Sequence, residues 1–307
     1  MKFFRRFIYL LYYLRETEWR RLRAFARHAS SETGKSAVGL LTSSVNSVFR
    51  YNTSLLDYFY FRFYGANAAY NSEWAGTGFM YEYQLKMNPP GVRSVLENKH
   101  EFNKKFRDLI GRNSYSAEEL SGNPELITTL LDAAHHSVVL KNSVGQAGKE
   151  VSVLPTEGLT HSRLMDIMKS QKFDIAEEYV TQHKDMMRLS PSGLNTVRII
   201  TQEENGAVIV LAARLRISIN SPVDNLAAGN AAAPVDTETG VVTGPAVFSD
   251  ITKTDITKHP VTGVEIPGFR IPLWPEVLEL VRNAALMVPE NRSIGWDIAI
   301  TDVCPIL

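Results

Sequence analysis

The sequence predicts an α+β protein, in which two mixed lobes follow a helical, aromatic-rich N-terminal segment. Three observations predict this class. Apolar side chains recur at helical spacing near the N-terminus, and helix-like and strand-like segments alternate in the middle of the chain. From residue 195 onwards, strand-like runs dominate. At 307 residues the chain is long enough for two lobes, each with its own core.

The expected parts are an N-terminal helical and aromatic segment at 1–90, a first lobe at 91–176 and a second lobe at 177–307. The first boundary lies at MNPPGV, residues 87–92, because two prolines and a glycine continue neither a helix nor a strand. DYFYFRFYG, residues 57–65, is dense in β-formers but follows a helical pattern, so its class stays open. Its aromatic side chains suit either a core or a platform that stacks on sugar rings.

Residues 1–28 are basic although the whole chain is not. They hold seven arginines, one lysine and two acidic residues, and the apolar run Phe7–Leu14 is too short for a bilayer span, which needs roughly 20 residues. Phenylalanines and leucines recur there at helical spacing between arginines. Such a helix either lies on an anionic membrane face or packs on the protein's own surface.

The overall charge is balanced, with 33 basic and 33 acidic residues, which argues against a general nucleic-acid-coating role. The single cysteine, Cys304, excludes an internal disulfide and a multi-cysteine metal site, and we expect it to be a buried structural thiol. We expect a cytoplasmic protein without a nucleic-acid partner, and the basic N-terminal helix adds the inner face of the cell membrane as a location. The sequence leaves the oligomeric state open.

Helical signals in the first lobe begin with an amphipathic stretch at 94–113. Ser116 and Glu119 have the spacing of a capping box, and Pro124 stands where a further helix can begin. SVVLKNSVGQAGKEVSVL, residues 137–154, then predicts a strand, a glycine-containing turn and a second strand.

The rest of the chain is predicted to be a short helix at 159–171, a strand at 174–180 and then mostly strands. An Asn-Gly turn at 205–206, between two alternating apolar runs, is a strong hairpin signal. A helix at 275–289 and a strand from Ile294 complete the pattern.

Lys141 stands inside an apolar strand and precedes a loop with Gly145 and Gly148. Glycines let backbone N–H groups approach phosphate oxygens, and a lysine held on a strand supplies a fixed positive charge. The alternative is an ordinary turn. About thirty residues on, DIAEEYVTQH at 174–183 fits a strand whose backbone meets an adenine edge, with polar residues beyond it near ribose; the alternative is an edge strand with solvated glutamates.

Arg198, Arg214 and Arg216 lie on two strands of the predicted hairpin. Residues 214 and 216 share one face by the period of two, and Arg198 can join them across the hairpin. Guanidiniums in strands of this apolar character are costly unless they meet anions, so phosphate, a substrate carboxylate or internal salt bridges are expected beside them. Asp297 is the only charge in Ile294–Ile300, and a carboxylate among apolar strand residues is costly unless it meets a cation; the alternative is that it caps a turn or pairs with an arginine.

Together these features resemble the ATP-grasp superfamily, and the closer similarity is to its bacterial sugar-transfer-associated branch, which is found with cell-surface polysaccharide synthesis. SGLNTVRIIT, VDNLAAGN, HPVTGVEIPGFRIPLWPEV and IGWDIAIT carry this closer similarity, which extends over residues 94–307. The implied fold is two α+β ATP-grasp lobes, and the implied cofactors are ATP and Mg²⁺.

The resemblance also implies a role for each candidate residue. ATP phosphates would be contacted by Lys99 and Lys141 and covered by the loop with Gly145 and Gly148; the adenine hinge would be Glu177, Glu178, Tyr179 and Val180, with His183 or Asp185 near ribose. Charge on the γ-phosphate and on an acyl-phosphate would be neutralised by Arg198, Arg214 and Arg216, while Asn225 would line the acceptor side and Asp297 would bind Mg²⁺.

Two departures from the family pattern bear on activity. The family's last strand continues into a Glu-x-Asn that binds metal, whereas this sequence ends at Leu307, so we expect a chain cut short at its C-terminus rather than a degenerate relative. Asn230 stands where the family tends to have a glycine. The expected reaction is ATP-dependent ligation of a carboxylate and an amine, small or glycan-linked, provided that the missing ligands exist in a longer chain. A nucleotide-binding scaffold for glycan assembly, a kinase-like phosphotransferase and a glycosyltransferase stay as alternatives.

Overall fold

The structure is a computed structural model, and it describes residues 2–133, 136–143 and 151–307. The chain divides into two compact units. Unit 1 comprises Met1–Pro89 and Phe248–Thr254, and unit 2 comprises Pro90–Val247 and Asp255–Leu307. The division thus falls inside the proline-rich segment at 87–92, and unit 1 also takes up seven residues from far along the chain, which the sequence did not suggest.

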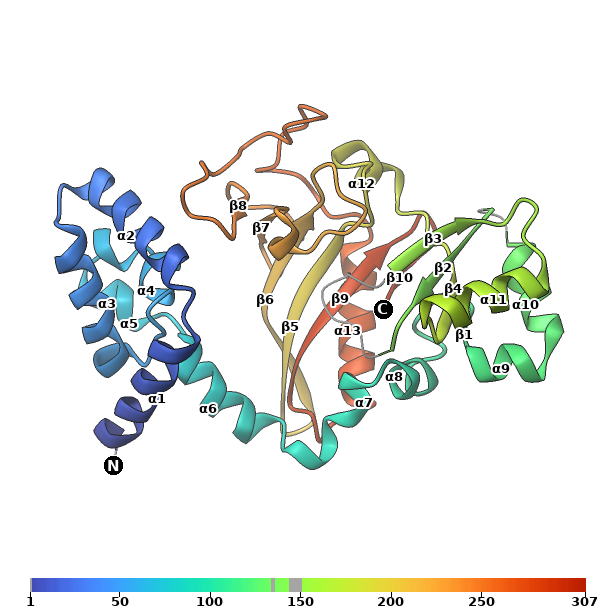
Figure 1. Ribbon diagram of the computed structural model, residues 1–307, viewed down its shortest axis with the longest axis horizontal. Helices are drawn as coiled ribbons and strands as arrows, with labels where there is room; N and C mark the ends of the chain where they lie inside the picture. The colour runs from blue at the N-terminus through green and yellow to red at the C-terminus, as the bar shows by residue number, and fades with distance from the viewer. Residues whose placement is uncertain (1, 134–135, 144–150) are drawn as a thin grey trace. The chain divides into compact units, whose positions relative to one another are not determined.

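Unit 1 is helical (Figure 1). Its elements are α1 (Lys2–Glu16), α2 (Trp19–Thr33), α3 (Ala37–Tyr51), α4 (Asp57–Tyr60), the 3₁₀ turn η1 (Phe63–Gly65), α5 (Ala68–Ser72) and α6 (Thr77–Met87). The segment whose class was open therefore forms α4 and η1, and its rings Phe59 and Phe63 lie in the core of the unit. Ile251 joins the same core, and Arg21 Nη2 donates to the Ser249 carbonyl over 2.6 Å, which ties the late segment to α2.

The first half of unit 2 is built around a four-stranded antiparallel sheet with the order β1-β4-β2-β3. Its elements are η2 (Pro90–Val92), α7 (Ser94–Glu97), α8 (Lys99–Lys105), β1 (Ser114–Ser116), α9 (Ala117–Gly122), α10 (Pro124–Leu131), β2 (Ser137–Lys141), β3 (Val151–Pro155), α11 (His161–Gln171) and β4 (Ile175–Glu178). Helices α9, α10 and α11 bury one face of this sheet around Leu130, Val138 and Leu164 (Figure 1). The opposite face carries Lys141 and Glu177 together with Val139 and Val153.

Local signals explain these elements. The capping box between Ser116 and Glu119 is present at the start of α9, and Pro124 opens α10, so both predictions are confirmed. The single helix expected at 94–113 is wrong, because α7 ends at Glu97 and α8 begins at Lys99. The reason is Asn98, whose side chain accepts hydrogen bonds from the backbone N–H groups of His100 and Glu101 and so caps a new helix.

The second half of unit 2 contains a six-stranded sheet with the order β10-β9-β5-β6-β7-β8. After α12 (Lys184–Leu189), its elements are β5 (Thr196–Glu204), β6 (Ala207–Ile217), η3 (Leu226–Ala228), β7 (Ala231–Val235), β8 (Val247–Phe248), α13 (Trp274–Leu286), β9 (Ser293–Ile300) and β10 (Pro305–Ile306). Asn205 and Gly206, at φ 53° and 82°, form the predicted hairpin turn between β5 and β6. Helix α13 packs on the apolar face of this sheet (Figure 1).

The segment between α8 and β1 packs against β9 and β10 of the six-stranded sheet. The ring of Phe106 lies 5.5 Å from that of Trp296 on β9, edge to face, and the Leu307 backbone N–H donates to the Leu109 carbonyl over 3.1 Å. A Cβ on Gly111 would lie 2.2 Å from the Ile306 side chain, so only glycine fits there. These contacts bring the end of β10 to the residues that lead into β1.

The turn between β9 and β10 corrects one expectation. Cys304 is exposed, not buried. Its backbone N–H and carbonyl are held by Thr301, at 3.1 Å and 3.1 Å, which fixes a tight turn at the surface. The thiol therefore points to solvent from a turn and contributes no packing to the core.

Candidate functional site

The first cluster of predicted residues surrounds the carboxylate of Glu177. Strand β4 lies beside β2, with Lys141 opposite Ile175, so Lys141 and Glu177 emerge on one face of the sheet. Lys141 Nζ lies 2.5 Å and Arg112 Nε 3.0 Å from Glu177 Oε2, and Ser114 Oγ donates to Oε1 over 3.1 Å. The carboxylate is shared by two cations and a hydroxyl.

Burial strongly affects this cluster, because the Glu177 side chain is only 5% exposed. Burial alone raises the pKa of Glu177, but Lys141 and Arg112 outweigh it and lower the pKa to about 2. The carboxylate is therefore ionised at neutral pH. Its side chain is paired with two cations, and its backbone lies between β1 and β2, opposite Ser114 and Val139, so a hinge role for Glu177 stays a prediction.

The other predicted hinge residues separate into two kinds. Glu178 accepts hydrogen bonds from the backbone and side-chain nitrogens of Asn113 at 2.9 Å and 2.8 Å, which fastens β4 to the entry of β1. Beyond β4, Tyr179 is exposed and Val180 half-buried. The division between the two sheets comes after Glu178, so both glutamates belong to the first sheet.

The predicted ribose residues lie at the start of α12. The His183 ring caps this helix by accepting from the Asp185 backbone N–H over 3.1 Å, and the His183 backbone N–H donates to the Ile300 carbonyl over 2.6 Å. The Asp185 carboxylate lies 3.7 Å from the guanidinium of Arg188 and is partly exposed. This segment is thereby held against the end of β9.

Lys99 and its neighbours on α8 hold the beginning of the glycine loop. Lys99 Nζ donates to the Asn142 carbonyl. The Asp174 carboxylate accepts from the Ser143 backbone N–H over 2.6 Å and from His100 Nε2 over 3.3 Å. Burial raises the pKa of Asp174, but these hydrogen bonds outweigh it and keep the pKa below its usual value. Gly145 and Gly148 themselves lie outside the described residues.

The second cluster is an arginine face on the six-stranded sheet, formed by Arg198, Arg214, Arg216 and Asp297. The strand register places Arg198 opposite both Arg214 on β6 and Asp297 on β9, so all four side chains share one face. This confirms the shared face that the period of two predicted. The opposite face is buried against α13 by residues such as Ile199 and Leu215.

The arginine face is linked by ion pairs. Asp297 accepts two hydrogen bonds from Arg198, over 2.5 Å and 2.6 Å, and its Oδ2 lies 2.9 Å from Arg216 Nη1. Burial raises the pKa of Asp297, but the two arginines outweigh it and lower the pKa. Arg216 also lies 2.7 Å from Asp224, whose pKa burial raises. Arg214 is exposed and has no ion pair with any described residue.

Asn225 and Asn230 shape the loop beside this face. The Asn225 side chain accepts from the Ala227 backbone N–H over 3.0 Å and caps η3. The buried Asn230 side chain donates to the carbonyls of Val223 and Asn225 and accepts from the Ile219 backbone N–H. The Asn230 side chain therefore holds this loop in place through its hydrogen bonds. A glycine at this position has no side chain and could not make them.

A buried network of polar side chains lies at the start of β5 and the end of β6. Gln182 Nε2 donates to the Ser190 carbonyl over 2.9 Å, and its Oε1 accepts from both nitrogens of Asn195. Asn195 Oδ1 accepts from the Ser218 backbone N–H over 2.7 Å, and His259 Nε2 donates to the Ser218 carbonyl over 3.0 Å. Because every member has partners, the network fixes the ends of β5 and β6.

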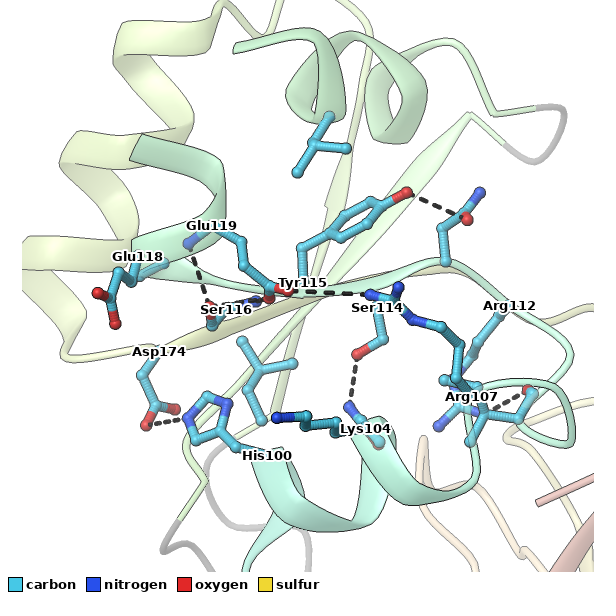
Figure 2. Close-up of a pocket in the computed structure, with 16 residues that line it drawn as sticks. His100, Lys104, Arg107, Arg112, Ser114, Tyr115, Ser116, Glu118, Glu119 and Asp174 are labelled. Atoms are coloured by element: carbon cyan, nitrogen blue, oxygen red, sulfur yellow. Dashed lines mark hydrogen bonds and ion pairs between the residues drawn. The ribbon is translucent and has the colours of Figure 1, made fainter. Parts of the chain in front are cut away.

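A pocket of about 1170 Å³ adjoins the first cluster. Figure 2 shows it between α8, which carries His100 and Lys104, and the stretch from Arg112 to Glu119, and Arg107, just beyond the end of α8, also lines it. Its lining includes Arg112 and Asp174, which contact Glu177 and the loop start respectively. None of the four residues of the arginine face lines it.

Comparison with known protein families decides the identity of this arrangement. A family model described as sugar-transfer associated ATP-grasp matches residues 79–307. The chain belongs to the sugar-transfer associated ATP-grasp family. A search of curated proteins gives no match.

Two solved structures are similar to this ATP-grasp chain at low identity. One is an L-amino acid ligase from Bacillus licheniformis, with 13% identity, a TM-score of 0.39, and coverage of 79% of this chain and 44% of that one. The other is a D-alanine–D-alanine ligase from Bacillus anthracis, with 14% identity, a TM-score of 0.33, and coverage of 69% and 54%. The chain thus spans about half the length of each ligase.

The described residues of this ATP-grasp chain do not by themselves form a magnesium site. Among them no three His, Cys, Asp or Glu residues gather as metal ligands. Both oxygens of Asp297 are engaged by arginines. A role for Asp297 as a Mg²⁺ ligand therefore stays a prediction, and we derive no chemical step from it.

Sequence reasoning missed Arg112 and the pairing role of Asp224. Arg112 lies 65 residues from its partner Glu177, and nothing local marks it except its place just before a strand. Asp224 lies in a loop and accepts from the Thr196 backbone N–H over 2.8 Å. The sequence does contain a signal for Asp224, because it is an acidic residue that closely follows the strand arginines, and buried arginines need anionic partners.

Proposed function

We propose that the chain is an ATP-dependent carboxylate–amine ligase that acts through an acyl-phosphate on a cell-surface polysaccharide or its precursor. The observation that carries the proposal is the arginine face, in an ATP-grasp chain, with three guanidiniums on one side of a sheet. Among the described residues only two carboxylates, Asp224 and Asp297, pair with them, and Arg214 is exposed. Phosphoryl oxygens are the anions that such a surface suits.

The proposed reaction has two steps. A substrate carboxylate oxygen attacks the γ-phosphorus of ATP, the bond from that phosphorus to the β–γ bridging oxygen breaks, and ADP leaves. An amine then attacks the carbonyl carbon of the acyl-phosphate, the bond to the phosphate oxygen breaks, and an amide, inorganic phosphate and a proton result. No protein nucleophile is needed, so the residues act by positioning and by stabilising charge.

Each cluster has a place in this proposal. Arg198, Arg214 and Arg216 neutralise charge on the transferred phosphoryl group, and Asn225 lines the acceptor side. Lys99 and Lys141 meet the phosphates from the first sheet, and the backbone beyond Glu178 meets adenine. ATP enters with Mg²⁺, which shields the phosphate charge. The family description, which refers to sugar transfer, supports the glycan substrate.

A catalytically inactive, nucleotide-binding scaffold is the second candidate. One observation favours it: the carboxylate expected to bind metal is held by two arginines, and no metal-ligand cluster is found among the described residues. In this case ATP binds between the same cations without turnover. The protein then acts as a nucleotide-bound scaffold in a glycan-assembly system.

One experiment separates the two candidates. The protein is incubated with Mg²⁺·ATP and a panel of uronic acids and amino acids, ADP is measured, and hydroxylamine is added to trap an acyl-phosphate as a hydroxamate. A ligase releases ADP only when an accepted carboxylate is present and yields the hydroxamate. ATP binding by calorimetry without ADP release across the panel supports the scaffold, and the absence of ATP binding contradicts both.

A further inference from the structure

Helix α1 has one packed side and one unpartnered apolar side. On the packed side Leu10 and Tyr13 are buried in the core of unit 1, and the Arg6 guanidinium donates to the Phe49 carbonyl on α3. On the opposite side Phe4, Ile8 and Leu11 are 70%, 48% and 52% exposed. Their spacing of four and three places them on one stripe.

Further apolar side chains widen this stripe. Phe7 and Leu14 lie along one edge and Tyr12 along the other, and all three are exposed. The helix therefore presents six large apolar side chains to solvent along its outer face. Contiguous apolar surface of this kind is rare on soluble monomers and marks an interaction site.

The neighbouring helix α2 supplies positive charge. Arg20, Arg23 and Arg27 are spaced at helical intervals on the exposed side of α2 and line a surface depression with Leu41 of α3. None of the three forms an ion pair with a described residue, although other arginines of unit 1, such as Arg5 with Glu82, do. Three guanidiniums without ion-pair partners on one helix face attract an anionic surface.

We propose that α1 and α2 dock unit 1 on the surface of an anionic phospholipid bilayer. The apolar stripe of α1 enters the boundary between head groups and acyl chains, and the arginines of α2 bind the phosphates. A helix of 15 residues lies in the plane of the membrane in this arrangement, in agreement with the finding that no described helix is long and apolar enough to cross one. A second copy of the chain is a poorer occupant, because it brings like charges together.

The test is co-sedimentation of the full chain with vesicles. We expect binding to vesicles of phosphatidylcholine with phosphatidylserine and at least tenfold weaker binding to phosphatidylcholine alone, with a decline as salt rises. The triple variant Phe4→Ser, Ile8→Ser, Leu11→Ser should lose binding. The triple variant Arg20→Gln, Arg23→Gln, Arg27→Gln should weaken it about a hundredfold and remove most of the salt dependence.

A matched control removes equally exposed apolar side chains from unit 2. The variant Ile209→Ser, Leu211→Ser, Val261→Ser changes residues that are 45%, 47% and 56% exposed, and it should bind vesicles like the parent chain. Thermal unfolding of all variants shows whether they remain folded. Equal binding to neutral and anionic vesicles, or binding that survives the α1 variant, overturns the proposal. A lipid-free dimer that the α1 variant abolishes, together with absent vesicle binding, assigns the face to self-association instead.

Discussion

Two charge clusters of unit 2 differ in how much of their charge is hidden from water. In the first, Lys141, Arg112 and Glu177 meet with the carboxylate only 5% exposed. In the second, the Arg198–Asp297 pair of the arginine face is about 40% exposed on both side chains. With Asp224 counted in the second, each cluster has one more cation than carboxylates, but only the second leaves a guanidinium, Arg214, open to solvent.

Because of this difference, we expect the charges of the first cluster to stabilise the fold and those of the second to be available to a ligand. A buried carboxylate shared by two cations cannot lose a partner without leaving an uncompensated charge, so the first cluster fixes the position of Lys141. An exposed pair is screened by water and exchanges partners at low cost. We therefore expect the first cluster to affect stability most and the second to affect ATP binding most.

The largest effect is expected from Glu177→Gln. The change leaves the Lys141 and Arg112 charges partly buried without their shared carboxylate, and we expect the free energy of unfolding to fall by about 3 kcal/mol. Urea denaturation measures it. The matched control is Glu265→Gln, which breaks an exposed pair with Lys258 and should leave the free energy of unfolding nearly unchanged. Equal losses in the two variants would remove the distinction between the clusters.

Acid should weaken the first cluster in a defined window. The pKa of Glu177 is lowered from its ordinary value of 4.5 to about 2 in the folded chain, so its stabilisation is complete above pH 4.5 and disappears as the pH falls toward 2. The difference in unfolding free energy between the parent chain and Glu177→Gln should shrink by roughly 2 kcal/mol between pH 7 and pH 3. A difference that is constant over this range would show that the carboxylate is not held ionised by its neighbours.

A smaller but more specific effect is expected from Arg214→Gln in the second cluster. Because Arg214 has no ion pair among the described residues, its loss should change the free energy of unfolding by at most about 0.5 kcal/mol. We expect ATP affinity, measured by calorimetry, to fall about tenfold. Arg163→Gln, which changes an exposed arginine on α11, serves as the control with unchanged affinity. Unchanged affinity in Arg214→Gln would contradict the proposed phosphate site.

Sequence and structure agree where the signal is local. The capping box of Ser116, the turn at Asn205 and the shared face of Arg214 and Arg216 follow from spacings of a few residues, and all are confirmed. The contact of Arg112 with Glu177 spans 65 residues, and Ile251 joins a core formed by residues more than 180 positions earlier. Such contacts depend on how the elements pack, for which a single sequence carries no periodic signal.

The variant Asp297→Asn tests whether the carboxylate of the second cluster binds metal or only pairs with its arginines. The Arg198 pair is about 40% exposed, so we expect a loss of at most about 1 kcal/mol in the free energy of unfolding. As a Mg²⁺ ligand, Asp297 would also set the metal requirement, and the variant should need about tenfold more Mg²⁺ for half-maximal ATP binding. An unchanged Mg²⁺ midpoint with weaker ATP binding would instead assign Asp297 to holding Arg198 and Arg216 in place. Both results are compatible with the proposed phosphate site on the arginine face, and they differ in whether Asp297 binds a metal or only its own arginines.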